Sequence, residues 1–159
     1  DVIWPRNALR HPLMCPYGAF SANDGSRTLV ACQAEREWHR FCEHVLQDKE
    51  FAGHPQAETN VIRVANRAFV EGKIEEVTSA ITREEFHARL RKADIAFGAV
   101  NTMPELSEHG ALRRITVGTP NGDIRMPAPA TTRGAARDDY GPAPGYDEHG
   151  AAIRAEFAS

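Results

Sequence analysis

Residues 17–46 decide the fold of this chain, and they read YGAFSANDGSRTLVACQAEREWHRFCEHVL. Two runs that favour β-structure, Tyr17–Ala22 and Thr28–Ala34, flank Asn23-Asp24-Gly25, where Gly25 supplies the positive φ of a tight reversal. Apolar residues then recur at helical spacing: Trp38, Phe41, Cys42, Val45 and Leu46. The stretch therefore predicts a β-hairpin followed by an amphipathic helix.

Further elements follow this hairpin and helix. The pattern predicts one long helix over 59–81, with an apolar stripe of Ile62, Ala65, Phe69, Ile74, Val77 and Ile81. Its other face carries the charged side chains Arg63, Arg67, Glu71, Glu75 and Glu76. Thr82 with Glu85 forms a capping box that opens another helix ending near Ala93. A buried strand over 95–100, a helix starting near Met103, a second hairpin at 114–119 and 123–126, and a short helix at 148–157 complete the prediction.

These elements place the chain in the α+β class. We expect an incoming linker at 1–16, a small α+β domain at 17–126 and an extended tail at 127–159 that ends in the short helix. The linker holds three prolines, and prolines and glycines interrupt the tail, so neither sustains a continuous element.

Composition excludes several functional classes. The chain has 159 residues, a net charge of -3 and only short apolar runs, so we expect neither a membrane span nor non-specific nucleic-acid binding. Three cysteines without paired spacing are expected to be thiols in a reducing cytoplasm. His39 and His44 lie five residues apart and point to different sides of a helix, so we expect no metal site.

Motifs for catalysis are missing from the sequence. It contains no G-x-S-x-G, no phosphate-binding glycine loop and no recognisable cysteine–histidine pair. Arg6, Arg10 and His11 cluster on the linker, where cations can hold a carboxylate or phosphate by charge-assisted hydrogen bonds. Ordinary solvated surface is the competing interpretation of this cluster.

The order of the segments resembles a known family. PYGAF, a DG turn, TLVACQAEREWHRFC, NVIRVANRAFVEGKIEEV, ADIAFGAVNTMPEL and DEHGAAIRAEF together resemble the C-terminal part of class III CoA-transferases, the carnitine dehydratase and bile-acid-inducible type. The resemblance runs from about Pro16 to the end of the chain. It implies an interlocked homodimer whose chains each have a large Rossmann-like domain, a smaller α+β domain and a C-terminal segment that returns to the large domain.

The same resemblance implies a function and its limits. A CoA-transferase would move coenzyme A between an acyl-CoA and a carboxylic or dicarboxylic acid, with the CoA thioester as substrate and no tightly bound cofactor. Its catalytic aspartate would lie in the large domain, to which no segment here corresponds. This chain would supply the substrate lid and dimer contacts, and its candidate substrate-binding residues are Arg6, Arg10, His11 and Tyr17.

Two alternatives stay open at this point. An acyl-CoA racemase on the same scaffold would use a glutamate where this sequence has Gln33 or Ala34. A non-catalytic interaction module is the second alternative. Because the sequence begins at Asp1 without a methionine, we expect it to be part of a larger protein and inactive alone.

Overall fold

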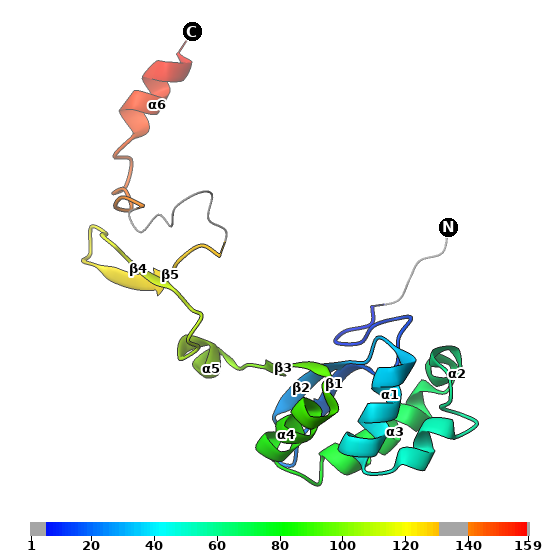
Figure 1. The fold of residues 1–159 in the computed structure, drawn as a ribbon. Helices are drawn as coiled ribbons and strands as arrows, with labels where there is room; N and C mark the ends of the chain where they lie inside the picture. The colour runs from blue at the N-terminus through cyan, green and yellow to red at the C-terminus, as the bar shows by residue number, and fades with distance from the viewer. Residues whose placement is uncertain (1–5, 131–139, 159) are drawn as a thin grey trace. The chain divides into compact units, whose positions relative to one another are not determined.

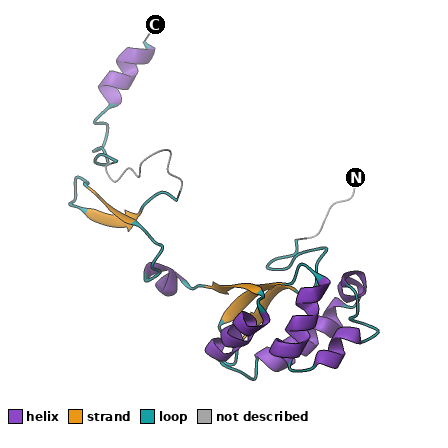
Figure 2. Cartoon of the chain, viewed as in Figure 1, coloured by secondary structure: helices purple, strands orange, loops and turns teal. Residues whose placement is uncertain are grey.

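The computed structural model describes residues 6–130 and 140–158. Its elements follow in the order β1 (Tyr17–Ser21), β2 (Arg27–Ala31), α1 (Glu35–Phe41), a π-helical turn (Cys42–Leu46), a 3-10 turn (Lys49–Gly53), α2 (Asn60–Ala65), α3 (Arg67–Thr78), α4 (Arg83–Ala93), β3 (Ala96–Val100), α5 (Met103–Ser107), β4 (Arg114–Val117), β5 (Ile124–Pro127) and α6 (Gly150–Phe157), as Figure 1 labels them. Helices and small antiparallel sheets are both present (Figure 2), which confirms the α+β class.

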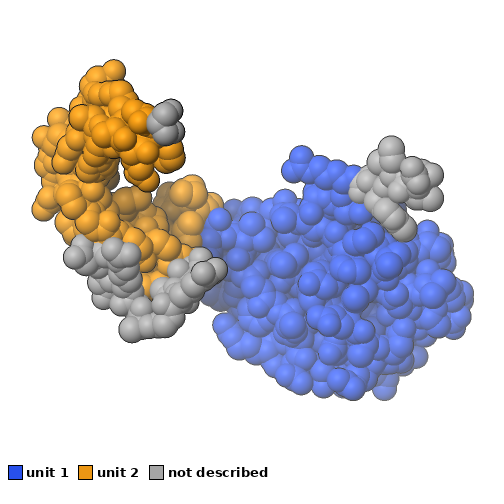
Figure 3. Space-filling view, turned by 90° about the horizontal axis from the view of Figure 1, so that it is seen from above, with its two compact units in different colours: residues 1–101 blue, residues 102–159 orange. Residues whose placement is uncertain are grey.

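The chain divides into two compact units, residues 1–101 and 102–159, coloured separately in Figure 3. The division falls within the small domain expected at 17–126. The boundaries 1–16, 17–126 and 127–159 therefore stay a prediction, and each unit is described below by itself.

A three-stranded antiparallel sheet in the order β1-β2-β3 organises the first unit. Its hairpin is the one predicted: Tyr17 pairs with Ala31 and Ser21 with Arg27. Gly25 has φ +79° in the turn, a conformation that side chains with a Cβ adopt at a cost. Strand β3 is confirmed as well, but the expected burial is wrong, because Ala96, Gly98 and Ala99 are exposed.

The core of this unit lies where the sheet meets its helices. Trp38 of α1 stacks on Phe41 with ring centroids 6.1 Å apart and meets Phe51 edge-on at 5.9 Å. Phe86 and Leu90 of α4 are fully buried with them. Burying several large apolar side chains together supplies the main driving force for folding this unit.

The single helix predicted over 59–81 is wrong, because it breaks at Asn66. The backbone there has φ -108° and ψ 31°, and the side-chain Nδ2 donates to the carbonyl of Ile62 at 3.0 Å. Asparagine favours such local hydrogen bonds at the end of a helix. The break leaves α2 and α3 as separate helices.

The break also changes which side chains are buried. Arg63 and Glu71, placed on the charged outer face by the sequence, are only 3% and 7% exposed. Phe69, placed in the apolar stripe, is 40% exposed. A periodic pattern read across a broken helix loses its phase, and that explains both errors.

The second unit contains α5, the hairpin of β4 and β5, and α6. Helix α5 has Pro104 in its first turn, as the sequence predicted. The structure adds a capping box of Thr102 and Glu105 at its start, which the sequence analysis did not predict. The backbone N–H of Ala143 donates to the carbonyl of Gly118 at 2.9 Å, so part of the expected tail returns to this hairpin. Residues 131–139 of the predicted tail lie outside the described residues.

Two predictions about the chain as a whole can be compared with the structure. All three cysteines are free thiols, as expected. In the stretches that the structure describes, no helix has the length and apolar character needed to cross a membrane.

Candidate functional site

The residues before β1, numbers 6–14, form what we call the N-terminal segment, and this segment pairs with the edge of the sheet. Arg10 makes an antiparallel bridge with Gly18, and the N–H of His11 donates to the carbonyl of Tyr17 at 2.9 Å. A Cβ added at Gly18 would stand 3.4 Å from both the Cγ of Arg10 and the carbonyl of Leu9. Glycine at this position therefore permits the close approach of the segment.

Side chains from α2 and α3 hold the segment in place. Arg67 donates through one nitrogen to the carbonyls of His11 at 2.9 Å and Met14 at 3.0 Å. Asn60 donates to the carbonyl of Leu13 at 2.9 Å and accepts from the N–H of Cys15 at 3.1 Å. Cys15 itself is fully buried. The end of the expected linker is thus part of the core rather than a loose connection.

Arg63 connects the same region to α1 from inside the core. Its guanidinium donates to the carbonyls of Cys15 at 2.7 Å and Ala57 at 3.0 Å and forms an ion pair with Glu35 at 2.9 Å. The group also lies 4.8 Å from the centre of the Trp38 ring. A charge buried this deeply is tolerated because its hydrogen bonds are satisfied and it has an anionic partner.

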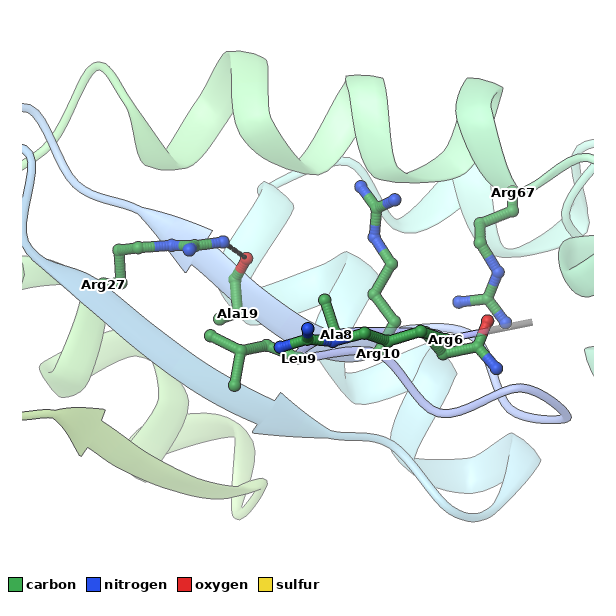
Figure 4. Close-up of a pocket in the computed structure, with 8 residues that line it drawn as sticks. Arg6, Ala8, Leu9, Arg10, Ala19, Arg27 and Arg67 are labelled. Carbon is green, nitrogen blue, oxygen red and sulfur yellow. Dashed lines mark hydrogen bonds between the residues drawn. The ribbon is translucent and has the colours of Figure 1, made fainter. Parts of the chain in front are cut away.

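Four arginines surround a cavity of about 310 Å³ beside the N-terminal segment, which we call the arginine pocket. Its lining consists of Arg6, Asn7, Ala8, Leu9, Arg10, Ala19, Arg27 and Arg67. In Figure 4, Arg27 reaches in from the sheet at one end and Arg67 from a helix at the other. Arg27 donates to the carbonyl of Ala19 at 3.3 Å. The pocket therefore gathers cations from three separate parts of the chain.

Glu71 offsets part of this positive charge. Its two carboxylate oxygens pair with Arg10 at 2.9 Å and with Arg67 at 3.0 Å. Arg6 and Arg27 have no ion-pair partner among the described residues. The lining is therefore strongly cationic, and such a surface attracts carboxylates and phosphates.

The structure divides the four predicted site residues into two pairs, Arg6 with Arg10 and His11 with Tyr17. Arg6 and Arg10 line the arginine pocket. His11 stacks on Tyr17 with ring centroids 5.2 Å apart, and His11 also lines a second cavity of about 320 Å³. Whether any of the four contacts substrate stays a prediction.

Sequence reasoning missed two members of the arginine pocket, Arg27 and Arg67. Arg67 was assigned only to the outer face of a helix. Arg27 opens the second hairpin strand and pairs with Ser21, which brings it to the same side as the segment. The hairpin register predicts the position of Arg27, but only the path of the N-terminal segment shows that Arg27 and Arg67 line the same cavity as Arg10.

The second cavity contains a thiol, yet no thiol here is a ready nucleophile. Burial raises the pKa of Cys32, which lines this cavity, far above its usual range. Burial likewise raises the pKa of Cys15 to about 11 and that of Cys42 to about 12. The thiolate is the reactive form, so these three cysteines are inert at neutral pH.

In the parts of the chain that the structure describes, no three histidine, cysteine or acidic side chains lie close enough together to hold a metal ion. Cys42 is fully buried in the core, in agreement with its place in the apolar stripe of the first predicted helix.

Comparison with known proteins identifies the family. The sequence model of CoA-transferase family III matches residues 3–150, which includes the N-terminal segment and both hairpins. The chain belongs to CoA-transferase family III. This finding confirms the resemblance drawn from the order of segments.

Two curated relatives are named as CoA-transferases with stated substrates. Acetyl-CoA:oxalate CoA-transferase of Acetobacter aceti is 28% identical over 154 residues, covering 94% of this chain and 39% of the relative. Succinyl-CoA:mesaconate CoA-transferase of Haloarcula marismortui is 34% identical over 79 residues, covering 50% of this chain and 19% of the relative. The family III chain thus spans about two fifths of the first relative and less of the second.

Solved structures agree with this assignment. A CAIB/BAIF family protein from Brucella suis is 29% identical, with a TM-score of 0.70, and the match covers 95% of this chain and 40% of that one. A protein from Mycobacterium tuberculosis, 16% identical with a TM-score of 0.71 over 87% of this chain and 40% of its own, shows the shared fold alone.

Proposed function

We propose that this chain is part of a CoA-transferase that moves coenzyme A from an acyl-CoA to a carboxylic acid, preferably a dicarboxylic one. The observation that carries the proposal is the family match over residues 3–150. The two curated relatives are named for the acceptors oxalate and mesaconate, and both of these are dicarboxylates. The cationic pocket supports an acceptor with a second negative charge.

The reaction needs a nucleophilic carboxylate, which we assign to an aspartate elsewhere in the larger protein. That carboxylate attacks the thioester carbonyl, the bond to sulfur breaks, and the CoA thiolate leaves a mixed anhydride behind. The thiolate then attacks the anhydride to give an enzyme thioester and releases the first acid. The acceptor carboxylate next attacks the enzyme thioester, and the same steps in reverse deliver CoA to it.

Carboxylates close to the N-terminal segment are poor candidates for that nucleophile. Glu71 is held between Arg10 and Arg67. Glu75 accepts hydrogen bonds from the backbone N–H and hydroxyl of Ser21 at 3.0 and 3.1 Å. Both groups are held by structural contacts, so the catalytic carboxylate is better sought outside this chain.

This chain would instead contribute a substrate lid. Arg6, Arg10, His11 and Tyr17 lie together along one edge of the sheet, where they can contact the acyl group and keep water from the anhydride. Several side chains fix the segment that carries them, including Arg67 and Asn60. A fixed surface positions substrate better than a loose loop does.

We also propose that the larger protein is a homodimer. Leu9 and Leu13 of the N-terminal segment are 43% and 60% exposed, and Val61 of α2 is 78% exposed. These apolar side chains are available for a second chain to cover, and their burial would favour association. Sedimentation of the larger protein should give twice the mass of one chain, and a stable monomer would contradict the proposal.

The activity test uses the larger protein that carries this chain and the 159-residue chain alone. Each is incubated with acetyl-CoA or succinyl-CoA and with oxalate, mesaconate or succinate, and the CoA thioesters are separated by chromatography. We expect transfer by the larger protein and none by the 159-residue chain. Transfer to no carboxylic acid by the larger protein would overturn the proposal, and turnover by the chain alone would refute the placement of the nucleophile.

The same assay separates transferase from racemase. A racemase would invert the configuration of a chiral acyl-CoA without an acceptor acid. Gln33 and Ala34, where that branch would need a glutamate, offer no ionisable group. We therefore expect no inversion without an acceptor.

A further inference from the structure

The arginine pocket has more positive charge than its surroundings neutralise. Among the described residues, four guanidinium groups line it and no carboxylate does. Glu71 stands behind Arg10 and Arg67 and offsets one charge. A hollow lined by charges of one sign raises the local concentration of anions.

The hydrogen-bonding capacity of the pocket points the same way. The two terminal nitrogens of Arg67 donate to Glu71 and to carbonyls of the N-terminal segment. Arg27 has one bond to the carbonyl of Ala19, at 3.3 Å, and Arg6 has none among the described residues. Since a guanidinium has five N–H donors, Arg6, Arg10 and Arg27 retain donors for a ligand.

We propose that the arginine pocket binds an oxyanion, with Arg6, Arg10 and Arg27 as its direct contacts. Arg67 acts as a positioning residue, because it holds the segment that carries Arg6 and Arg10. Carboxylate and phosphate oxygens both fit the planar, forked donors of arginine. In the proposed transferase the pocket holds the second carboxylate of a dicarboxylic substrate, and this assignment rests on the proposed function.

The volume of the arginine pocket and the charges around it favour a small anion as its ligand. A volume of about 310 Å³ lies at the lower end of small-molecule sites, so a short dicarboxylate fits better than a whole coenzyme. An adjoining cavity shares Arg10 and Ala19 but is lined by Glu71 and Glu75. Those carboxylates repel an anion and restrict it to the arginine side.

Binding is measured on the 159-residue chain by calorimetry and by NMR shifts of the amides of 8–10 and 18–20. The probes are succinate, acetate, inorganic phosphate and adenosine 3',5'-bisphosphate, which is the phosphate-bearing end of coenzyme A. We expect saturable binding of succinate that weakens as salt is added, because both partners are charged. Acetate should bind more weakly, since it lacks the second charge.

Variants assign the binding to named residues. Arg6→Gln combined with Arg27→Gln should weaken succinate binding about tenfold, which equals about 1.4 kcal/mol. Both residues are exposed, so their replacement leaves the core intact, and an unchanged amide spectrum outside the pocket checks this. Arg36→Gln removes the same charge from an exposed position of α1 that lines no described pocket, and it should have no effect.

Each outcome bears on the proposal. The bisphosphate could bind more tightly than succinate and lose the same affinity in the double variant. That result would support the oxyanion site and would show that the bound oxyanion is a phosphate of coenzyme A. The proposal is overturned by the absence of saturable binding, or by binding that the double variant leaves unchanged. Because this assay needs no turnover, CoA transfer without binding would reject the pocket alone, and binding without CoA transfer would reject the proposed function alone.

Discussion

Arg63 is the residue whose place in the fold departs furthest from its sequence pattern. A guanidinium that is 3% exposed joins three parts of the first unit through the carbonyls of Cys15 and Ala57 and the carboxylate of Glu35. Removing it would take the guanidinium donor away from the buried bonds to the carbonyls of Cys15 and Ala57.

We predict that Arg63→Met lowers the free energy of unfolding by about 3 kcal/mol, because buried acceptors lose a charged donor. Urea denaturation followed by circular dichroism measures the change. Arg36→Met, on the exposed side of α1, serves as the control and should stay within about 0.5 kcal/mol. A loss below about 1 kcal/mol for Arg63→Met would mean that the contacts of Arg63 matter little.

His87 gives the first unit a dependence on pH. Its Nε2 lies 2.9 Å from the hydroxyl of the fully buried Thr28, and its ring lies 4.7 Å from that of Phe97. Burial lowers the pKa of His87, and the nearby Arg91 and Arg83 lower it further, while Glu84 opposes them. The folded state therefore binds this proton less readily than the unfolded chain does.

The sign of the effect follows from that difference. The contribution of His87 to stability is complete above the unfolded pKa of about 6.5 and is lost as the pH falls toward the lower folded value. Wild-type protein and His87→Gln are compared by urea denaturation at neutral and mildly acidic pH. We expect the wild type to lose more stability on acidification, and equal losses in the two proteins would show that His87 does not contribute.

At the scale of elements, α4 has the most explicit start signal. The hydroxyl of Thr82 accepts from the N–H of Glu85 at 3.2 Å, and Glu84 and Glu85 favour the first turn. Thr82 and Glu85 also predicted this helix from sequence, and the helix is confirmed. Of the predicted capping box the structure has the Thr82 bond, whereas the carboxylate of Glu85 accepts from Arg89 at 2.7 Å.

Thr82→Ala should cost about 1 kcal/mol of stability, the usual value for a lost N-terminal cap. Thr82→Ser keeps the oxygen and should retain most of that stability. Thermal or urea unfolding of the three proteins distinguishes them. If serine and alanine were equally destabilising, the hydroxyl bond would not be the cause.

At the scale of the whole molecule, the two units differ in how much apolar surface they bury. The first unit has a continuous core built around Trp38, Phe41 and Phe86. Among the described residues from 102 onward, Ile115 is the one buried hydrophobic side chain. Ile153 and Phe157 of α6 are 53% and 75% exposed.

This contrast predicts unequal protection against hydrogen exchange in the 159-residue chain. Amides of α1, α4 and β2 should exchange slowly, because opening them exposes the core. Amides of β4, β5 and α6 should exchange much faster, and in the larger protein they should become protected if that protein covers them. Equal protection of both units in the isolated chain would contradict the prediction.

Local chemistry in the sequence determined much of this protein. The hairpin at Gly25, the cap at Thr82, the helix start near Met103 and the burial of Cys42 follow from backbone preference and short-range periodicity. The order of these segments also led to the family. Each of these signals depends on residues close together in the chain, so it can be read without a structure.

The tertiary structure alone decided the rest. Arg63 is buried because the carbonyl of Cys15 and the carboxylate of Glu35, both far away in sequence, accept hydrogen bonds from its guanidinium. The arginine pocket formed because the N-terminal segment pairs with β1, which places Arg10 on the same cavity as Arg27 and Arg67. Contacts between residues so far apart in sequence depend on how the chain folds back, and no local pattern specifies that.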